Sequence, residues 1–282
     1  MTERLADISA RIDGIHQLGS VVNAMKGMAA ARARAARTQI GAVDSYAATI
    51  AAAISSVIGP NVPPSRENTE RDTGKTGLLV FCAEQGFAGA FSERVLDSIG
   101  HDLETEALFL VGTRGFSIAA SRGLVPVWTA AMPAHTSGIA KLADRTTKAI
   151  YHRLEEGWIE GLDVLYTGWN SGRPAVVRQA LFPIDLSDFP TTENETPLTQ
   201  IPADTLINGL SADYFHALVC KAALHAFAAE NEARMEAMSA AGSQIARELD
   251  EFQGTLRRVR QEAITAEIIE LGTGAASARD AR

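Results

Sequence analysis

The sequence predicts an α/β protein, in which the N- and C-terminal helices form a long antiparallel coiled coil and a Rossmann-like α/β domain with a mainly parallel sheet lies between them. Two observations support this fold class. Near both ends of the 282-residue chain, apolar residues recur every three or four positions, which is the spacing of a coiled-coil seam. Between those ends, short apolar runs alternate with turn residues and amphipathic stretches, as is typical of α/β domains.

The N-terminal helix is expected over residues 1–58, where one apolar stripe is continuous. Thr2 can serve as its N-cap, and Gly59 and Pro60 would end it. Alanine dominates residues 29–53, which favours helix and lets a partner helix approach closely. The predicted stripe consists of Leu5, Ile8, Ile12, Ile15, Leu18, Val22, Met25, Met28, Ala36, Ile40, Val43, Ala47, Ile50, Ile54 and Val57.

The C-terminal helix is expected over residues 206–282, because no proline follows Pro202. A helix of about 70 residues would span about 100 Å. Most globular helices are far shorter, so this one needs a partner along its length, and the N-terminal helix is the simplest candidate. Its predicted seam is Met235, Met238, Gly242, Ile245, Leu249, Phe252, Leu256, Val259 and Ala263, and a similar stripe precedes it at Ile207, Leu210, Tyr214, Leu218 and Leu224.

The central domain is expected over residues 74–205, between a polar linker and a Pro-, Thr- and acid-rich loop. Its pattern reads βαβαβαββ, which predicts a parallel sheet that ends in a hairpin. Pro126 places the third strand at an edge, because proline cannot donate a ladder hydrogen bond. The expected strands are 78–82, 107–111, 125–128, 162–166 and 175–181, and the expected helices are 92–104, 114–121 and 136–156.

Composition excludes several classes of protein. The net charge is −8 with the acidic excess mainly in the middle of the chain, which argues against a nucleic-acid partner. The two cysteines form no disulfide framework, which fits a reducing compartment. No signal peptide is recognisable, and no apolar run is expected to reach the ~20 residues of a membrane span. The sequence therefore predicts a soluble or peripheral protein.

Two glycine-containing stretches invite a phosphate-binding interpretation. Thr73-Gly74-Lys75-Thr76 resembles the end of a phosphate loop, but the first glycine of that motif is replaced by Thr69. The stretch 86–89 follows a predicted strand and opens a helix, yet it matches the dinucleotide motif only in part. A tight strand-to-helix turn is the favoured interpretation, and no nucleotide is expected to bind.

No catalytic, cofactor or metal site is expected. None of the six histidines pairs with another histidine or a cysteine at metal-ligand spacing. Cys82 lies within a predicted buried strand and is interpreted as a core residue. Two interpretations stay open on these grounds. An α/β enzyme with helical dimerisation arms would carry a bound nucleotide or metal, and a self-associating coiled-coil scaffold would be a stable homodimer.

Three blocks of sequence resemble the γ subunit of F-type ATP synthases. They begin at Ala24-Met25-Lys26, at Ala233-Arg234-Met235 and at Arg260-Gln261, in the order that the family shows. The turn at 86–91 resembles the family's Gly-x-x-Gly-x-Phe turn. Departures at Gln85, at Phe87-Ala88 and at Arg257-Arg258 mark the chain as a divergent bacterial member.

The resemblance implies a rotating central shaft that couples ion flow, such as hydrogen ion transport, to ATP synthesis or hydrolysis in surrounding catalytic subunits. The implied partners are the α and β subunits of the F1 hexamer, the ε subunit and the membrane c-ring, with no nucleic acid and no small-molecule substrate. The shaft would carry no active site or cofactor, and would lie peripherally on the cytoplasmic face of the bacterial inner membrane. The implied contacts with a loop of the catalytic subunits are Met25, Lys26, Arg234, Arg260, Gln261, Thr265 and Glu267.

Overall fold

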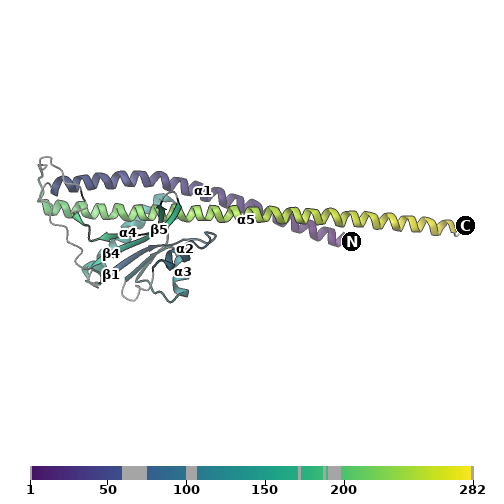
Figure 1. Cartoon of the computed structure of the whole chain (residues 1–282), viewed down its shortest axis with the longest axis horizontal. Helices are drawn as coiled ribbons and strands as arrows, with labels where there is room; N and C mark the ends of the chain where they lie inside the picture. Colours follow the sequence, from purple (N-terminus) through teal and green to yellow (C-terminus); the bar gives the residue numbers. More distant parts are fainter. Residues whose placement is uncertain are drawn as a thin grey trace. The chain divides into compact units, whose positions relative to one another are not determined.

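The computed structural model of the chain describes residues 2–58, 75–99, 107–170, 173–186, 189 and 198–280, with side chains described between 4 and 271 apart from 170. Residues 60–74 of the predicted linker 60–75, the hairpin turn at 171–172 and residues 187–188 and 190–197 of the loop 183–204 lie outside the described residues. The elements, in order, are α1 (Thr2–Ile58), β1 (Thr76–Phe81), α2 (Phe91–Asp97), β2 (Ala107–Val111), α3 (Thr113–Ser121), β3 (Trp128–Ala130), η2 (Thr136–Gly138), α4 (Ile139–Glu155), β4 (Gly161–Asn170), β5 (Arg173–Phe182) and α5 (Ala203–Asp280) (Figure 1).

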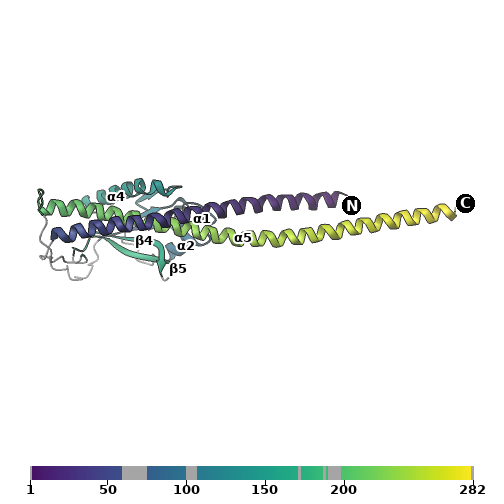
Figure 2. The ribbon, with the colours of Figure 1, turned by 90° about the horizontal axis from the view of Figure 1, so that it is seen from above.

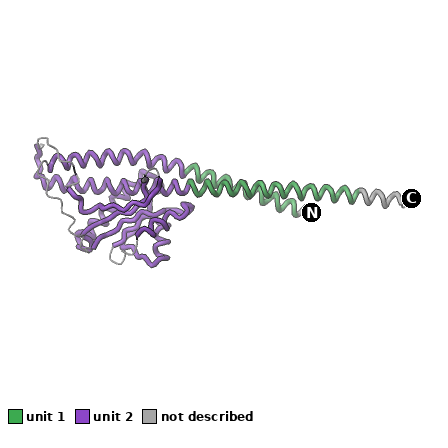
Figure 3. The backbone as a smooth tube through the Cα atoms, viewed as in Figure 1, with its two compact units in different colours: residues 1–28, 235–282 green, residues 29–234 purple. Residues whose placement is uncertain are grey.

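The chain packs as two compact units, and both long helices contribute to each of them (Figure 3). Unit 1 comprises residues 1–28 and 235–282, and unit 2 comprises residues 29–234. The two long helices and the α/β element order are confirmed. The expected division of the chain into three domains, 1–58, 74–205 and 206–282, stays a prediction.

In unit 1, α1 and α5 run antiparallel. The buried residues Ile12 and Val259 belong to one apolar cluster near the start of α1. Further along α1, the Lys26 Nζ donates a hydrogen bond to the Ser239 Oγ over 3.1 Å. Residues of rising number in α1 therefore meet residues of falling number in α5, as the two stripes predicted.

The α1 seam in unit 1 differs from the predicted stripe at two positions. Leu18 and Met28 were expected to face α5, but their side chains are 53% and 55% exposed. The half-buried Gly19 and the buried Ala29 lie on the packed side instead. Apolar side chains occur both on the packed side and beside it in this stretch, so two seams are compatible with the sequence, and packing against α5 selects one of them.

Unit 2 is built on a five-stranded sheet with the strand order β3-β2-β1-β4-β5. The first four strands are parallel, and β5 is antiparallel to β4. This confirms the mainly parallel sheet ending in a hairpin. The edge strand β3 begins at Trp128, later than the expected 125, since Pro126 lacks the N–H that a strand pairs through.

Helices cover both faces of the sheet (Figures 1 and 2). On one face, Leu79 and Phe109 pack with α4 and with Phe215 of α5. On the other, Val80 and Leu110 pack with α2 and α3. Alternate residues of each strand therefore serve opposite cores, and in the central strands both sets are apolar because both faces are buried. The long helix α5 is thus part of the core of unit 2.

A close contact between α3 and the end of β1 gives the first prediction. A Cβ atom on Gly115 would lie 2.0 Å from the Cβ of Cys82, and both residues are buried. Gly115→Ala should therefore lower the free energy of unfolding by about 1–3 kcal/mol through overpacking, measured by urea denaturation. The control Gly41→Ala, exposed in α1 with no atom near its added methyl, should stabilise the protein slightly. Equal effects of the two substitutions would contradict the packing.

One described helix, α1, meets the length and composition of a membrane span over Arg4–Ile58. The sequence analysis expected no such stretch. Many weakly apolar alanines with few charges among them together reach the mean hydropathy of a membrane span. Core helices of soluble proteins and signal sequences meet the same criterion, so it is weak evidence. In unit 2 the same helix is tied to α5, where the Lys221 Nζ lies 2.7 Å from an oxygen of Asp44.

Candidate functional site

Four of the predicted contact residues lie on the distal part of α5 in unit 1. Arg260, Gln261, Thr265 and Glu267 are all exposed. Among the residues that the structure describes, the one hydrogen bond they make is local, because the Thr265 Oγ1 donates to the carbonyl oxygen of Gln261 over 2.9 Å. In the described part of the chain, neither Arg260 nor Glu267 takes part in an ion pair with N···O under 4.0 Å. Their charged groups are therefore available to a partner.

Large apolar side chains are exposed among these polar residues. Ile264 and Ile268 are 52% and 64% exposed, and Ile269 and Leu271 are exposed to a similar extent. A shallow, open depression runs beside them and is lined by Arg258, Gln261, Glu262, Thr265, Ala266 and Ile269. Contiguous exposed apolar surface rimmed by polar groups marks interaction sites. This part of α5 is therefore a candidate partner-contact surface.

A second apolar surface lies on α1, also in unit 1. Leu18, Val21 and Met28 are each more than half exposed, and Met25 is half-buried. These positions are three or four residues apart, so they share one side of the helix. The predicted contact residue Lys26 is exposed beside them, with its ammonium group bonded to Ser239. Unit 1 thus presents apolar surface on both of its helices.

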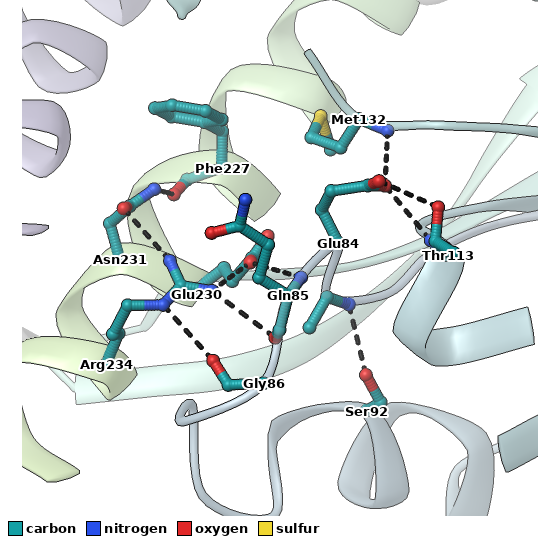
Figure 4. A network of polar contacts seen from close by, with 11 residues as sticks. Glu84, Gln85, Gly86, Ser92, Thr113, Met132, Phe227, Glu230, Asn231 and Arg234 are labelled. Atoms are coloured by element: carbon teal, nitrogen blue, oxygen red, sulfur yellow. Dashed lines mark hydrogen bonds and ion pairs between the residues drawn. The ribbon is translucent and has the colours of Figure 1, made fainter. Parts of the chain in front are cut away.

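Arg234 belongs to unit 2 and is only 5% exposed. Its Nη2 lies 2.5 Å from the Glu230 Oε1, and its Nη1 donates to the Asn231 Oδ1 over 3.1 Å (Figure 4). It also donates to the backbone oxygens of Gln85 and Gly86, each over 3.3 Å. The guanidinium group is therefore used within the chain, unlike the exposed residues of α5.

Sequence reasoning missed the partners of Arg234. Glu230 and Asn231 are 3% and 2% exposed, and the structure brings them to the loop that follows β1. From the sequence, Glu230 and Arg234 look like an ordinary surface pair spaced by four residues on a charged helix. The available signal was the alanine-rich sequence around them, which indicates that this side of α5 is buried.

Glu84 lies at the carboxyl end of the parallel strands, the edge at which doubly wound sheets bind ligands. It follows β1, and its carboxylate accepts hydrogen bonds from the Thr113 N over 3.0 Å and the Met132 N over 2.8 Å. The Thr113 Oγ1 donates to it over 2.7 Å. Phosphates bind to such N–H groups at helix N-termini in nucleotide-binding domains. In this chain a carboxylate of the protein already caps the start of α3.

The turn 86–89 has the backbone of a tight turn. Phe87 and Gly89 have φ angles of 61° and 57°, in the left-handed region that glycine adopts readily. This supports the structural interpretation of the glycines. The other candidate phosphate motif, at Thr73-Gly74, lies outside the described residues.

We predict that the full-length chain binds no nucleotide with useful affinity. The Glu84 carboxylate accepts from the N–H group of Thr113 at the start of α3 and would repel a phosphate there. Titration calorimetry with ATP and with ADP should give no binding heat at micromolar protein and ligand concentrations. A dissociation constant in the micromolar range would show that the crevice is open to ligands.

Both cysteines are buried thiols. Burial raises the pKa of Cys82 to about 12 and, with help from the nearby Asp144 charge, the pKa of Cys220 to about 11. His216 lies between Asp144 and Cys220, but both of its ring nitrogens are about equally far from the sulfur, at 3.9 and 4.0 Å. Cys82 is 1% exposed within the apolar cluster on one face of the sheet, so its interpretation as a core residue is confirmed. Among the described residues, no group of three or more metal-ligating side chains could hold an ion.

Comparison with known proteins identifies the family. A family model described as ATP synthase matches residues 4–278. The ATP synthase gamma chain of Moorella thermoacetica is 26% identical over 96% of this chain and 98% of its own length. The chain belongs to the ATP synthase gamma-chain family. The gamma chain of Solibacter usitatus is 29% identical, over 97% of this chain and 99% of its own length.

Solved structures agree in fold with the gamma-chain assignment. A chain in the structure of the Euglena gracilis mitochondrial ATP synthase, described as OSCP/F1/c-ring in rotational state 3, covers 98% of this chain and 95% of its own, with a TM-score of 0.61 and 14% identity. A chain of the rotor of the same enzyme gives a TM-score of 0.60. The resemblance to a bacterial gamma subunit is confirmed, and identities below 30% accord with its divergence.

Proposed function

We propose that this chain is the central shaft of an F-type ATP synthase, which couples ion flow through a membrane ring to ATP synthesis or hydrolysis in the surrounding subunits. The observation that carries the proposal is the full-length match to gamma chains, from residue 4 to residue 278. The exposed apolar surface of unit 1 supports it. The two helices of unit 1 leave that surface exposed, and a ring of surrounding subunits would cover it.

The proposed partners are the α and β subunits of the F1 hexamer, the ε subunit and the membrane c-ring. The rotor and F1/c-ring assemblies in which the similar Euglena gracilis chains occur support F1 and a c-ring as partners, whereas the ε subunit rests on the sequence resemblance alone. The chain would be a peripheral membrane protein of the cytoplasmic face of the bacterial inner membrane. The transported ion, H⁺ or Na⁺, is set by ligands in the ring and not by this chain.

The shape of α5 suits a shaft. It is one continuous helix of 78 residues, which gives it a length of about 115 Å. Its distal part presents different side chains in different directions, with Arg260 and Glu267 on one side and Thr265 on another. A single such helix inside a ring of three catalytic subunits would meet each of them with a different surface. That asymmetry would hold the three sites in different states.

We assign the contact with the catalytic subunits to Arg260, Gln261, Thr265 and Glu267, with Met25 and Lys26 as a second group. Arginine and glutamine offer several donors in fixed geometries, suited to carbonyl and carboxylate oxygens on a passing loop. Arg234 was predicted to share this role, but its donors are occupied within unit 2. We therefore leave it out of the contact surface.

Affinity purification of the tagged full-length chain from its native membranes tests the proposal. The chain should co-elute with two large subunits in about threefold excess over it and with a small hydrophobic ring-forming subunit. An untagged strain controls for nonspecific capture. Elution of the chain alone, or as a homodimer, would favour the scaffold interpretation and refute the shaft.

A further inference from the structure

The part of α5 that is buried in unit 2 is rich in alanine. Six of its residues that are at most 3% exposed are alanines, at positions 217, 222, 223, 226, 228 and 229, and the larger Phe215, Val219, Leu224 and Phe227 are buried among them. Apolar burial is non-directional, and the methyl groups of alanine offer less relief for interlocking ridges and grooves than larger side chains do. This packing binds the helix to the sheet, but it defines the axial position of the helix less sharply than directional hydrogen bonds do.

The polar network at the end of this part of α5 is directional. We propose that Glu230 and Arg234 form a register pin, a pair of buried charged side chains that fixes α5 against the carboxyl end of β1. Figure 4 shows both side chains reaching from α5 to the loop at Gln85 and Gly86. Without the pin, α5 would keep only its apolar packing against the sheet, which tolerates a wider range of positions.

The contacts define position in more than one direction. Arg234 donates to two successive carbonyl oxygens, of Gln85 and Gly86, while the Glu230 Oε1 accepts from the Gln85 N over 3.3 Å. The loop is therefore held through both donors and acceptors. A shift of one helical turn, about 5.4 Å, would break all three contacts.

The fork of Arg234 is itself fixed by Asn231. The Asn231 Oδ1 accepts from the Arg234 Nη1, and the Asn231 Nδ2 donates to the Phe227 carbonyl oxygen of its own helix over 2.8 Å. Asn231 is thereby tied to α5 and holds the guanidinium plane in one orientation. A planar, pre-organised fork loses little entropy when it binds carbonyl oxygens.

Glu84 extends the pin into the rest of the sheet domain. It adjoins Gln85 in the chain and binds Thr113 at the start of α3 and Met132 beyond β3. The loop that α5 grips is thus joined to the ends of neighbouring strands and does not swing freely. If the chain is a shaft, as proposed above, this connection lets the sheet domain turn with α5 under torque.

Spin-label distances on the isolated full-length chain test the pin. Labels at Ser117→Cys in α3 and Asp213→Cys in α5 are both exposed and both lie in unit 2. The native thiols are buried, and a chain without the new cysteines checks that they stay unlabelled. In the background Glu230→Gln/Arg234→Leu, which leaves no buried charge, the width of the distance distribution should increase about twofold or more. The matched control is Glu232→Gln, also on α5, which removes the ion pair to Arg37 of α1. It should leave the width of the distance distribution unchanged.

Arg234→Lys provides a second variant that keeps the charge. Its single ammonium group can pair with Glu230, but it cannot also reach both carbonyl oxygens, so the distribution should broaden by a smaller factor. If the double variant fails to fold, Arg234→Lys decides alone. If every variant that folds keeps the width of the distance distribution of the parental chain, the proposal of a register pin is refuted. The measurement needs no partner subunit, so it stands or falls separately from the shaft function.

Discussion

Arg234→Leu should lower the free energy of unfolding by about 3–5 kcal/mol, because it leaves the Glu230 carboxylate buried without its partner. Glu230 is 3% exposed, and within the described part of the chain the backbone N–H of Gln85 would remain as its one hydrogen-bond donor. Desolvation of an unpaired carboxylate is among the largest costs that one substitution can impose. Urea denaturation followed by circular dichroism measures the change.

Comparison with a double variant distinguishes this cause from a simple loss of packing. Glu230→Gln/Arg234→Leu removes both charges, so its cost should be smaller than that of Arg234→Leu alone, about 1–3 kcal/mol. The exposed pair of Arg247 and Gln244 on the same helix provides a control, since Arg247→Leu should change stability by less than about 0.5 kcal/mol. A double variant less stable than the single one would show that the buried pair is not the source of the effect.

Arg260→Ala/Gln261→Ala should slow ATP turnover of the assembled enzyme roughly tenfold or more, or reduce the ions moved per ATP, without loss of assembly. Each charge-assisted contact with a catalytic subunit would contribute about 1–3 kcal/mol. Both side chains are exposed and lie away from the α1 seam, so the chain itself should fold as before. Hydrolysis and ion pumping, both measured on reconstituted vesicles, report the effect.

The control for this variant uses the same residue types elsewhere on α5. Gln244→Ala/Arg247→Ala removes one glutamine and one arginine that hydrogen-bond to each other and are exposed. It should keep parental hydrolysis and pumping. If the Arg260 variant also keeps both at the parental level in an assembled enzyme, those two residues do not carry the coupling.

Local pattern predicted most of the fold. The α5 seam through Met238 and Val259 is set by period, and the structure buries both residues among exposed neighbours. For the same reason, positions such as Arg260 and Thr265, which fall off that seam, could be expected on the outside. The inner strands β1, β2 and β4 were identified by short continuous apolar runs, which the structure buries.

Pattern fails where several solutions are locally equal. On α1, either Leu18 or the adjacent Gly19 could lie on the packed side, so the phase of the seam stays open until α5 is in place. In the structure Gly19 is half-buried and Leu18 is exposed. Around Glu230, burial depends on a loop at Gln85 that lies 145 residues away in the sequence. The alanine-rich sequence around Glu230 indicates a buried side of α5, but no local signal shows which loop closes over the charged pair, so the network is visible only in the fold.

The most direct test of the shaft is a cryo-electron-microscopy map of the complex purified from native membranes. The account predicts one copy of this chain at the centre of a ring of large subunits, with residues 256–271 of α5 enclosed by that ring. The exposed isoleucines Ile264 and Ile268 should contact its inner wall. A map that places the chain outside the ring, or two copies paired through their helices, would contradict it.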